Sequence, residues 1–264
     1  MGANMKREKM RKSGQHGFSM IELMLVLAII SVVVGGLFSQ MDQAQQRAYA
    51  ERVKLDNMQE ARDFVDQFFR DINEIGYPNV RMMDVSSAFW SPALTTPSTY
   101  AWGNPYTNDY RMAVGLVKID NTAIQFEADT NGDGNVQSMQ YKINGNGNCT
   151  LCLQRSQVPK VAGDPLNGQT PNWGTEVNDA LNPIIFTYFK TDGTQVPSAS
   201  LPLDISTQAG AQTLASIKTI KISLLISNPT VIDLKSGQVI QTSFEGEVSL
   251  NNCSMATANQ PMSC

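Results

Sequence analysis

The sequence of 264 residues predicts an α+β protein in which one long N-terminal helix precedes an antiparallel, β-rich head. The first observation is an apolar run over residues 18–38 that continues into an amphipathic helical pattern up to Ile75. The second is a series of short segments with alternating apolar residues from Met112 onwards. We therefore expect three regions: a leader (1–17), a helix (18–76) and a head (77–264).

Composition and charge argue against several function classes. The hydrophobic share of 42% and the charged share of 17% are typical of an ordered globular protein. A net charge of −4 disfavours binding to nucleic acid, which needs a basic face. The first 17 residues carry +4, which leaves −8 on the remainder, and they hold His16, the only histidine. A chain without this leader has no imidazole for Ser-His-Asp or Cys-His catalysis, so we expect a protein that is not an enzyme.

The apolar run, residues 18–38, is long enough to cross a membrane. As a helix its 21 residues rise about 31 Å, roughly the hydrocarbon thickness of a bilayer. The basic residues before it predict a cytoplasmic N-terminus and a head outside the cytoplasm. A secretory signal peptide fits less well, because its apolar region is shorter, about 7–15 residues. We expect a single pass through the cytoplasmic membrane, with residues 39–76 forming an amphipathic continuation of the helix.

Glu22 is an unusual residue inside this run. An unpaired carboxylate in a membrane helix costs up to about 3 kcal/mol at the bilayer centre and less near the interface. One interpretation is a plain anchor with an incidental glutamate. The other is cleavage between Gly17 and Phe18, which creates an α-ammonium group that neutralises Glu22 of the same chain or of a neighbouring copy.

The segment Gly17-Phe18-Ser19-Met20-Ile21-Glu22-Leu23 resembles the class III signal of type IV pilins and of type II secretion pseudopilins. The resemblance implies that a prepilin peptidase cleaves after Gly17 and N-methylates Phe18. It also implies that Glu22 pairs with the N-terminus of an adjacent subunit during filament assembly. The implied partners are other pilin or pseudopilin subunits, the prepilin peptidase and the assembly platform in the cytoplasmic membrane. Many major pilins have a proline near the position of Ser39; this chain has none, and Gly35-Gly36 is a candidate for the flexible point.

Beyond the membrane run, apolar residues recur at steps of three or four, apart from one gap across Glu51 and Arg52, and the pattern ends at Gly76 and Pro78. We expect the part of this stripe from residue 55 to residue 75 to pack in the core of the head. The stripe consists of Met41, Ala44, Ala48, Leu55, Met58, Ala61, Val65, Phe68, Ile72 and Ile75.

The head is expected to be antiparallel, because residues 220, 222, 224 and 226 place apolar side chains on one face of a strand. Two stretches, 84–110 and 156–182, are expected to be loops that carry the three tryptophans. The predicted strands are Met112–Ile119, Ala123–Glu127, Val136–Ile143, Pro183–Lys190, Ile217–Ser227 and Gln238–Leu250.

Two phrases in the head, 126–135 and 185–193, resemble the large minor pilins of the PilW type and the J-type minor pseudopilins. This resemblance implies a pilin-like fold and a minor subunit that initiates or caps a type IV pilus. The alternatives are a minor pseudopilin of a type II secretion system, a membrane-tethered binding domain and a tip adhesin. The expected location is the cytoplasmic membrane and then a pilus or pseudopilus.

One turn has the composition of a calcium loop. Oxygen-bearing side chains alternate around Gly134, which matches the first half of such a loop, and they belong to Asp129, Asn131, Asp133 and Asn135. Position twelve is Gln140 in place of a bidentate glutamate. The alternative is a hairpin turn, because Asn, Asp and Gly tolerate left-handed backbone angles. Calcium would be structural, and no other cofactor is expected.

The cysteines are disulfide candidates, because we expect the head to lie outside the cytoplasm. They are Cys149, Cys152, Cys253 and Cys264, and they allow three connectivities. The resemblance to pilins with a disulfide-bounded tail implies a bond between Cys253 and Cys264, which leaves Cys149 with Cys152. A four-thiolate zinc site and a redox motif are the alternatives that fit less well.

Overall fold

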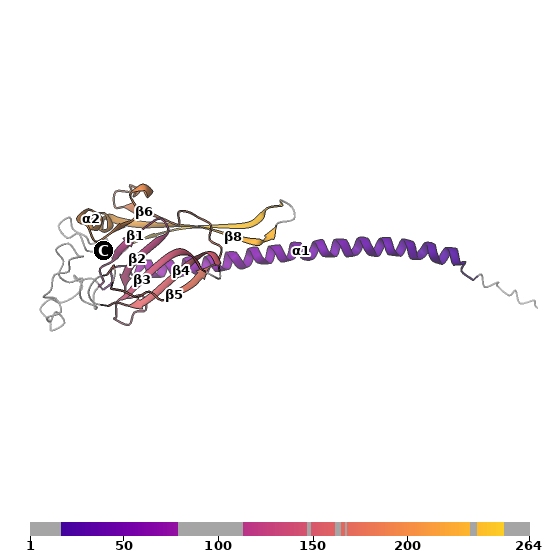
Figure 1. The fold of residues 1–264 in the computed structure, drawn as a ribbon, viewed down its shortest axis with the longest axis horizontal. Coiled ribbons are helices and arrows are strands. Elements are labelled where there is room, and N and C mark those ends of the chain that lie inside the picture. The colour runs from indigo at the N-terminus through magenta and orange to yellow at the C-terminus, as the bar shows by residue number, and fades with distance from the viewer. Residues whose placement is uncertain are drawn as a thin grey trace, which may run out of the picture. The chain divides into compact units, whose positions relative to one another are not determined.

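The computed structural model describes residues 17–78, 113–146, 149–161, 165–166, 168–232 and 237–250. A long helix, α1 (Met20–Asn73), precedes a head of antiparallel strands (Figure 1), which confirms the predicted α+β class. The chain divides into two compact units, one ending at Tyr49 and one comprising Ala50–Cys264. The second half of α1 is therefore part of the head.

Local chemistry explains both ends of α1. At its start, the Ser19 carbonyl accepts hydrogen bonds from the backbone N–H groups of Glu22 (3.0 Å) and Leu23 (3.1 Å). The helix continues through Gly35 and Gly36. At its end, Gly76 adopts a φ of 76°, a left-handed conformation that stops a helix at little cost in a glycine. The predicted helix end is confirmed to within a few residues.

Two antiparallel sheets form the head. The larger has the order β5-β4-β3-β2-β1-β7 and the smaller the order β6-β8-β9. The strands of the larger sheet are β1 (Leu116–Ile119), β2 (Ala123–Ala128), β3 (Gln137–Asn146), β4 (Cys149–Pro159), β5 (Trp173–Val177) and β7 (Leu203–Asp204). Those of the smaller are β6 (Phe186–Lys190), β8 (Ile217–Ile232) and β9 (Val239–Ser249). A 3-10 turn, η5 (Ser198–Ser200), and a short helix, α2 (Gln208–Ser216), lie between β6 and β8 in the chain.

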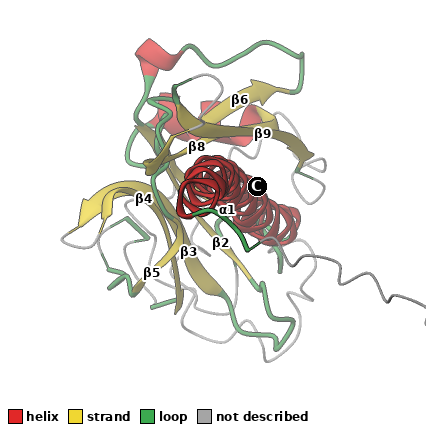
Figure 2. Cartoon of the chain, turned by 90° about the vertical axis from the view of Figure 1, so that its right-hand side faces the viewer, coloured by secondary structure: helices red, strands yellow, loops and turns green. Residues whose placement is uncertain are grey.

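The core lies where the second half of α1 passes between the two sheets (Figure 2). The centroid of the Phe68 ring lies 5.3 Å from the ring centroid of Tyr141 on β3 and 5.4 Å from that of Phe186 on β6. One side chain of α1 therefore contacts both sheets. The expected core packing is confirmed from Ala61 to Ile75.

The expected core packing is wrong at the start of that stretch. Leu55 is 65% exposed and Met58 is 47% exposed. The buried face of α1 instead passes through Asn57 and Phe64, because steps of three and four residues fit two neighbouring faces of a helix equally well.

The structure contains strands that the sequence patterns did not predict. β5 and the end of β4 fall inside the stretch 156–182, which was expected to be loop. β1 starts at Leu116 and not at Met112; Gly115, with a φ of 93°, precedes it, and Met112 lies outside the described residues. All of the other predicted loop, 84–110, also lies outside them.

Candidate processing and assembly site

The predicted cleavage position lies just before α1. Gly17, Phe18 and Ser19 have no regular secondary structure, and Phe18 is 80% exposed. A β-carbon added at Gly17 would meet no other atom within 4 Å. The bond between Gly17 and Phe18 thus lies in an exposed, non-helical segment, which is the kind of segment that a peptidase can bind.

Glu22 lies in the first turn of α1, four residues after Phe18. The positive end of the helix dipole is at this turn, which favours a carboxylate there. Within the described residues, no side chain forms a hydrogen bond or ion pair with the Glu22 carboxylate. As far as the described residues go, this acid is therefore available to a cation from another group.

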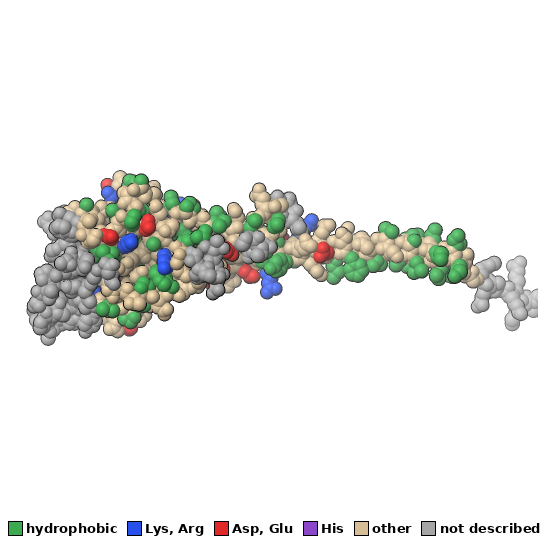
Figure 3. Space-filling model, viewed as in Figure 1, with side chains coloured by type: hydrophobic (Ala, Val, Ile, Leu, Met, Phe, Trp, Pro, Cys, Tyr) green, Lys and Arg blue, Asp and Glu red, His purple; other side chains and the backbone are tan. Residues whose placement is uncertain are grey.

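The surface of α1 from Met20 to Phe38 is mostly apolar and is exposed. Figure 3 shows hydrophobic side chains along this part of the helix, and none of the residues in its most apolar 18-residue window is buried. By length and composition this helix can cross a membrane, which suggests membrane anchoring. The predicted single-pass orientation stays a prediction.

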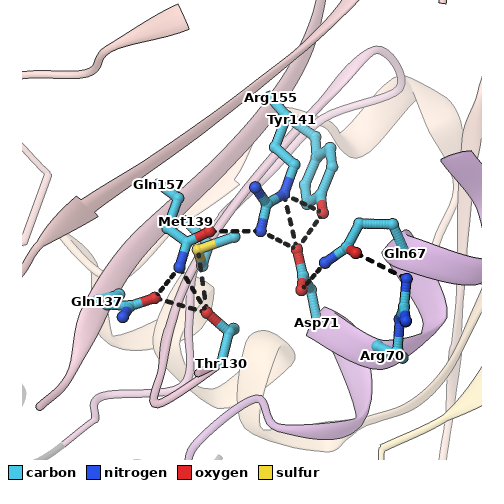
Figure 4. A network of polar contacts seen from close by, with 9 residues as sticks. All are labelled: Gln67, Arg70, Asp71, Thr130, Gln137, Met139, Tyr141, Arg155 and Gln157. Atoms are coloured by element: carbon cyan, nitrogen blue, oxygen red, sulfur yellow. Dashed lines mark hydrogen bonds and ion pairs between the residues drawn. The ribbon is translucent and has the colours of Figure 1, made fainter. Parts of the chain in front are cut away.

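A network of hydrogen bonds connects the second half of α1 to the larger sheet (Figure 4). Asp71 is its centre: Oδ2 accepts hydrogen bonds from the Tyr141 hydroxyl and from Arg155 Nε (2.8 Å), and Oδ1 accepts one from Gln67 (2.7 Å). Burial, together with the Asp71 charge, raises the pKa of Tyr141 well above its usual value, so the phenol stays protonated and donates. Asp71 follows Phe64 and Phe68 at steps of four and three, which was the available signal that it faces the core.

A second ion pair is fully buried at the end of α1. Lys160 Nζ lies 2.5 Å from Glu127 Oε2, and the two side chains are 0% and 1% exposed. Glu127 Oε2 also accepts a hydrogen bond from the backbone N–H of Val114 (2.9 Å), and its carbonyl accepts one from Gly76 (3.1 Å). No local sequence pattern indicates this pair, because Glu127 lies on β2 and Lys160 lies 33 residues later, just after β4.

The predicted calcium residues lie in the turn between β2 and β3; they are Asp129, Asn131, Asp133 and Asn135. The Asp129 carboxylate accepts hydrogen bonds from the backbone N–H groups of Gly132 (2.9 Å) and Gly134 (2.8 Å). The backbone N–H of Asn135 donates to Asp133 (2.8 Å) and lowers the pKa of that carboxyl. These bonds support the hairpin-turn interpretation. No three His, Cys, Asp or Glu side chains gather as a metal site in the described part of the chain, and the calcium site stays a prediction.

Cys152, on β4, is disulfide-bonded. The side chain of Cys149 and all of Cys253 and Cys264 lie outside the described residues. The connectivity of the four cysteines stays a prediction.

Comparison with known proteins identifies one family model, described as a prokaryotic N-terminal methylation motif, which matches residues 12–38. None of the curated proteins and none of the solved structures compared with the chain matches it. The matched segment contains Gly17, Phe18, Glu22 and the whole apolar run. The motif thus supports placing this chain in the pilin and pseudopilin superfamily, whose members are structural subunits that a prepilin peptidase processes and that associate with other such subunits.

Proposed function

We propose that this chain is a minor pilin-like subunit that initiates or caps a type IV pilus. A prepilin peptidase cleaves it after Gly17 and methylates Phe18. The assembly platform then moves it from the cytoplasmic membrane into the filament, with the head outside the cytoplasm. The observation that carries this proposal is the methylation motif over residues 12–38, of which residues 20–38 form an exposed and mostly apolar part of α1.

Two physical effects, apolar contacts between helices and a charge pair, support assembly through α1. Its apolar side chains exchange contacts with lipid for contacts with neighbouring helices, so leaving the bilayer does not expose them to water. Glu22 carries a charge that needs a partner in this apolar environment, and the α-ammonium of Phe18 is such a partner. The pair disfavours any register between helices that leaves either charge alone.

Glu22→Ala is expected to lower the amount of this chain in purified filaments about tenfold or more. The reason is that losing a charge pair worth about 1.4 kcal/mol already changes an equilibrium constant about tenfold. The measurement is the ratio of filament-bound to membrane-bound protein in cells that lack the wild-type gene. Glu51→Ala is the matched control, since Glu51 is an exposed glutamate on the same helix. Equal incorporation of all three proteins would contradict the assembly role.

The same deletion strain distinguishes the alternatives. Loss of surface filaments supports a type IV pilus, and loss of protein secretion with filaments intact supports a minor pseudopilin. If both persist and the purified protein binds a small ligand or a host surface, the chain is a tethered binding domain or an adhesin.

A further inference from the structure

β9 forms one edge of the smaller sheet (Figure 2), and no strand among the described residues pairs with its outer side. The backbone N–H of Leu250 donates to the carbonyl of Lys218 (2.8 Å). This bond shows which residues of β9 direct their backbone groups toward β8. Even-numbered residues of β9 therefore bond to β8, and odd-numbered residues direct their N–H and C=O groups outward. The outward row consists of Gln241, Ser243, Glu245, Glu247 and Ser249.

Apart from the charges of Glu245 and Glu247, this edge lacks the usual protection against pairing. β9 is 11 residues long and contains neither lysine nor proline, and its register with β8 is regular from Ile240 to Ser249. Within the part of the chain that the structure describes, no backbone hydrogen bond reaches its outer row. A long, regular, open edge is the form of strand that accepts another strand.

An exposed apolar flank of α1 lies beside this edge. Near one end of β9, Ile240 clusters with Ala50; towards the other, Gly246 lies directly against the Phe69 ring, with no room for a β-carbon. α1 and β9 therefore run alongside each other. Met58 lies eleven residues, about three helical turns, before Phe69 and shares its side of the helix. Met58 and its neighbour Leu55 are the exposed residues that an added strand would cover.

The charges of β9 indicate what kind of strand fits. Glu245 and Glu247 both point to the solvent face, and Glu245 reaches Lys221 at 2.8 Å while remaining 60% exposed. A second copy of β9 would bring further carboxylates to this row, which like-charge repulsion disfavours. A strand with Lys or Arg on its outer face and apolar residues on its inner face satisfies both the acidic row and the flank of α1.

We propose that the open edge of β9 is a docking site for an extended segment of a neighbouring, different filament subunit. That segment alternates apolar side chains, which cover Leu55 and Met58, with basic side chains opposite Glu245 and Glu247. It adds a fourth strand to the sheet β6-β8-β9 through backbone hydrogen bonds to the outward row. This inference rests on the proposed function, because the partner is another subunit of the same filament.

Photo-crosslinking in filament-producing cells tests the proposal on the full chain. A photoreactive phenylalanine analogue is placed at Gln241, in the outward row, and at Asp192, an exposed turn residue, as the control position. Ser243→Pro then removes one outward N–H and blocks an added strand, and it spares the β8 ladder, which that N–H does not join. Ser243→Ala keeps the N–H, and Met58→Glu puts a charge under the added strand.

We expect the Gln241 position to crosslink to a segment of another processed, N-methylated subunit in which apolar and basic residues alternate. Ser243→Pro and Met58→Glu should each lower the yield about tenfold or more, Ser243→Ala should not, and the melting temperature of the head should stay the same. A chain that is processed and incorporated but gives no such crosslink, or crosslinks only to its own copies, overturns this inference and leaves the proposed function standing. A chain that is not processed overturns both.

Discussion

Glu127→Ala is expected to destabilise the head by about 3–5 kcal/mol, because it removes a buried carboxylate that accepts hydrogen bonds from the Lys160 ammonium group and from the backbone N–H of Val114. Lys160 is 0% exposed and lies 2.5 Å from Glu127, so water cannot replace the lost carboxylate without opening the core. The loss should appear in urea unfolding of a fragment 50–264, which contains the whole described core.

A double variant separates charge from packing in this pair. Glu127→Met combined with Lys160→Met removes both charges and keeps much of the volume, so its stability should lie near or above that of the wild type. Glu247→Ala, at an exposed glutamate of the same head, should change stability by no more than about 0.5 kcal/mol. A double variant as unstable as Glu127→Ala would show that packing, and not the loss of the buried carboxylate charge, is responsible.

Asp71→Ala is the second change with a large expected effect, about 3–5 kcal/mol. The carboxylate of Asp71 is 2% exposed and accepts hydrogen bonds from Gln67, Tyr141 and Arg155, so three donors lose their acceptor together. Tyr141 on β3 and Arg155 on β4 then no longer form hydrogen bonds to Asp71 of α1. Urea unfolding of the same fragment measures the loss.

Titration of the phenol gives a readout that is independent of unfolding. After burial, the Asp71 charge is the second cause of the raised pKa of Tyr141. The pKa of Tyr141 should therefore fall in Asp71→Ala. The ultraviolet absorbance of the phenolate measures this titration. Asp66→Ala is the matched control, because Asp66 is exposed on the same helix, and it should leave both stability and titration unchanged. An unchanged Tyr141 titration in Asp71→Ala would contradict the network.

The sequence predicted the features that depend on local pattern. α1, its end near Gly76 and the core positions of Phe68 and Ile72 follow from helical periodicity and from backbone angles that glycine tolerates. Strand β8 follows from strict alternation.

What the patterns missed depends on partners distant in the chain. β4 and β5 are strands because β3 pairs with β4 and β4 with β5, while their own residues are mostly polar. Leu55 and Met58 are apolar at helical spacing yet exposed, since burial depends on where the sheets lie. The bond of Lys160 to Glu127 likewise exists only once β2 and the end of β4 are folded.

The intact mass of the protein extracted from membranes or filaments shows whether the chain is processed. We expect a chain that begins at Phe18, lacks residues 1–17 and carries one additional methyl group. A mass that corresponds to an unmodified chain beginning at Met1 would contradict the proposed function, because the ammonium group that is proposed to pair with Glu22 would then never form.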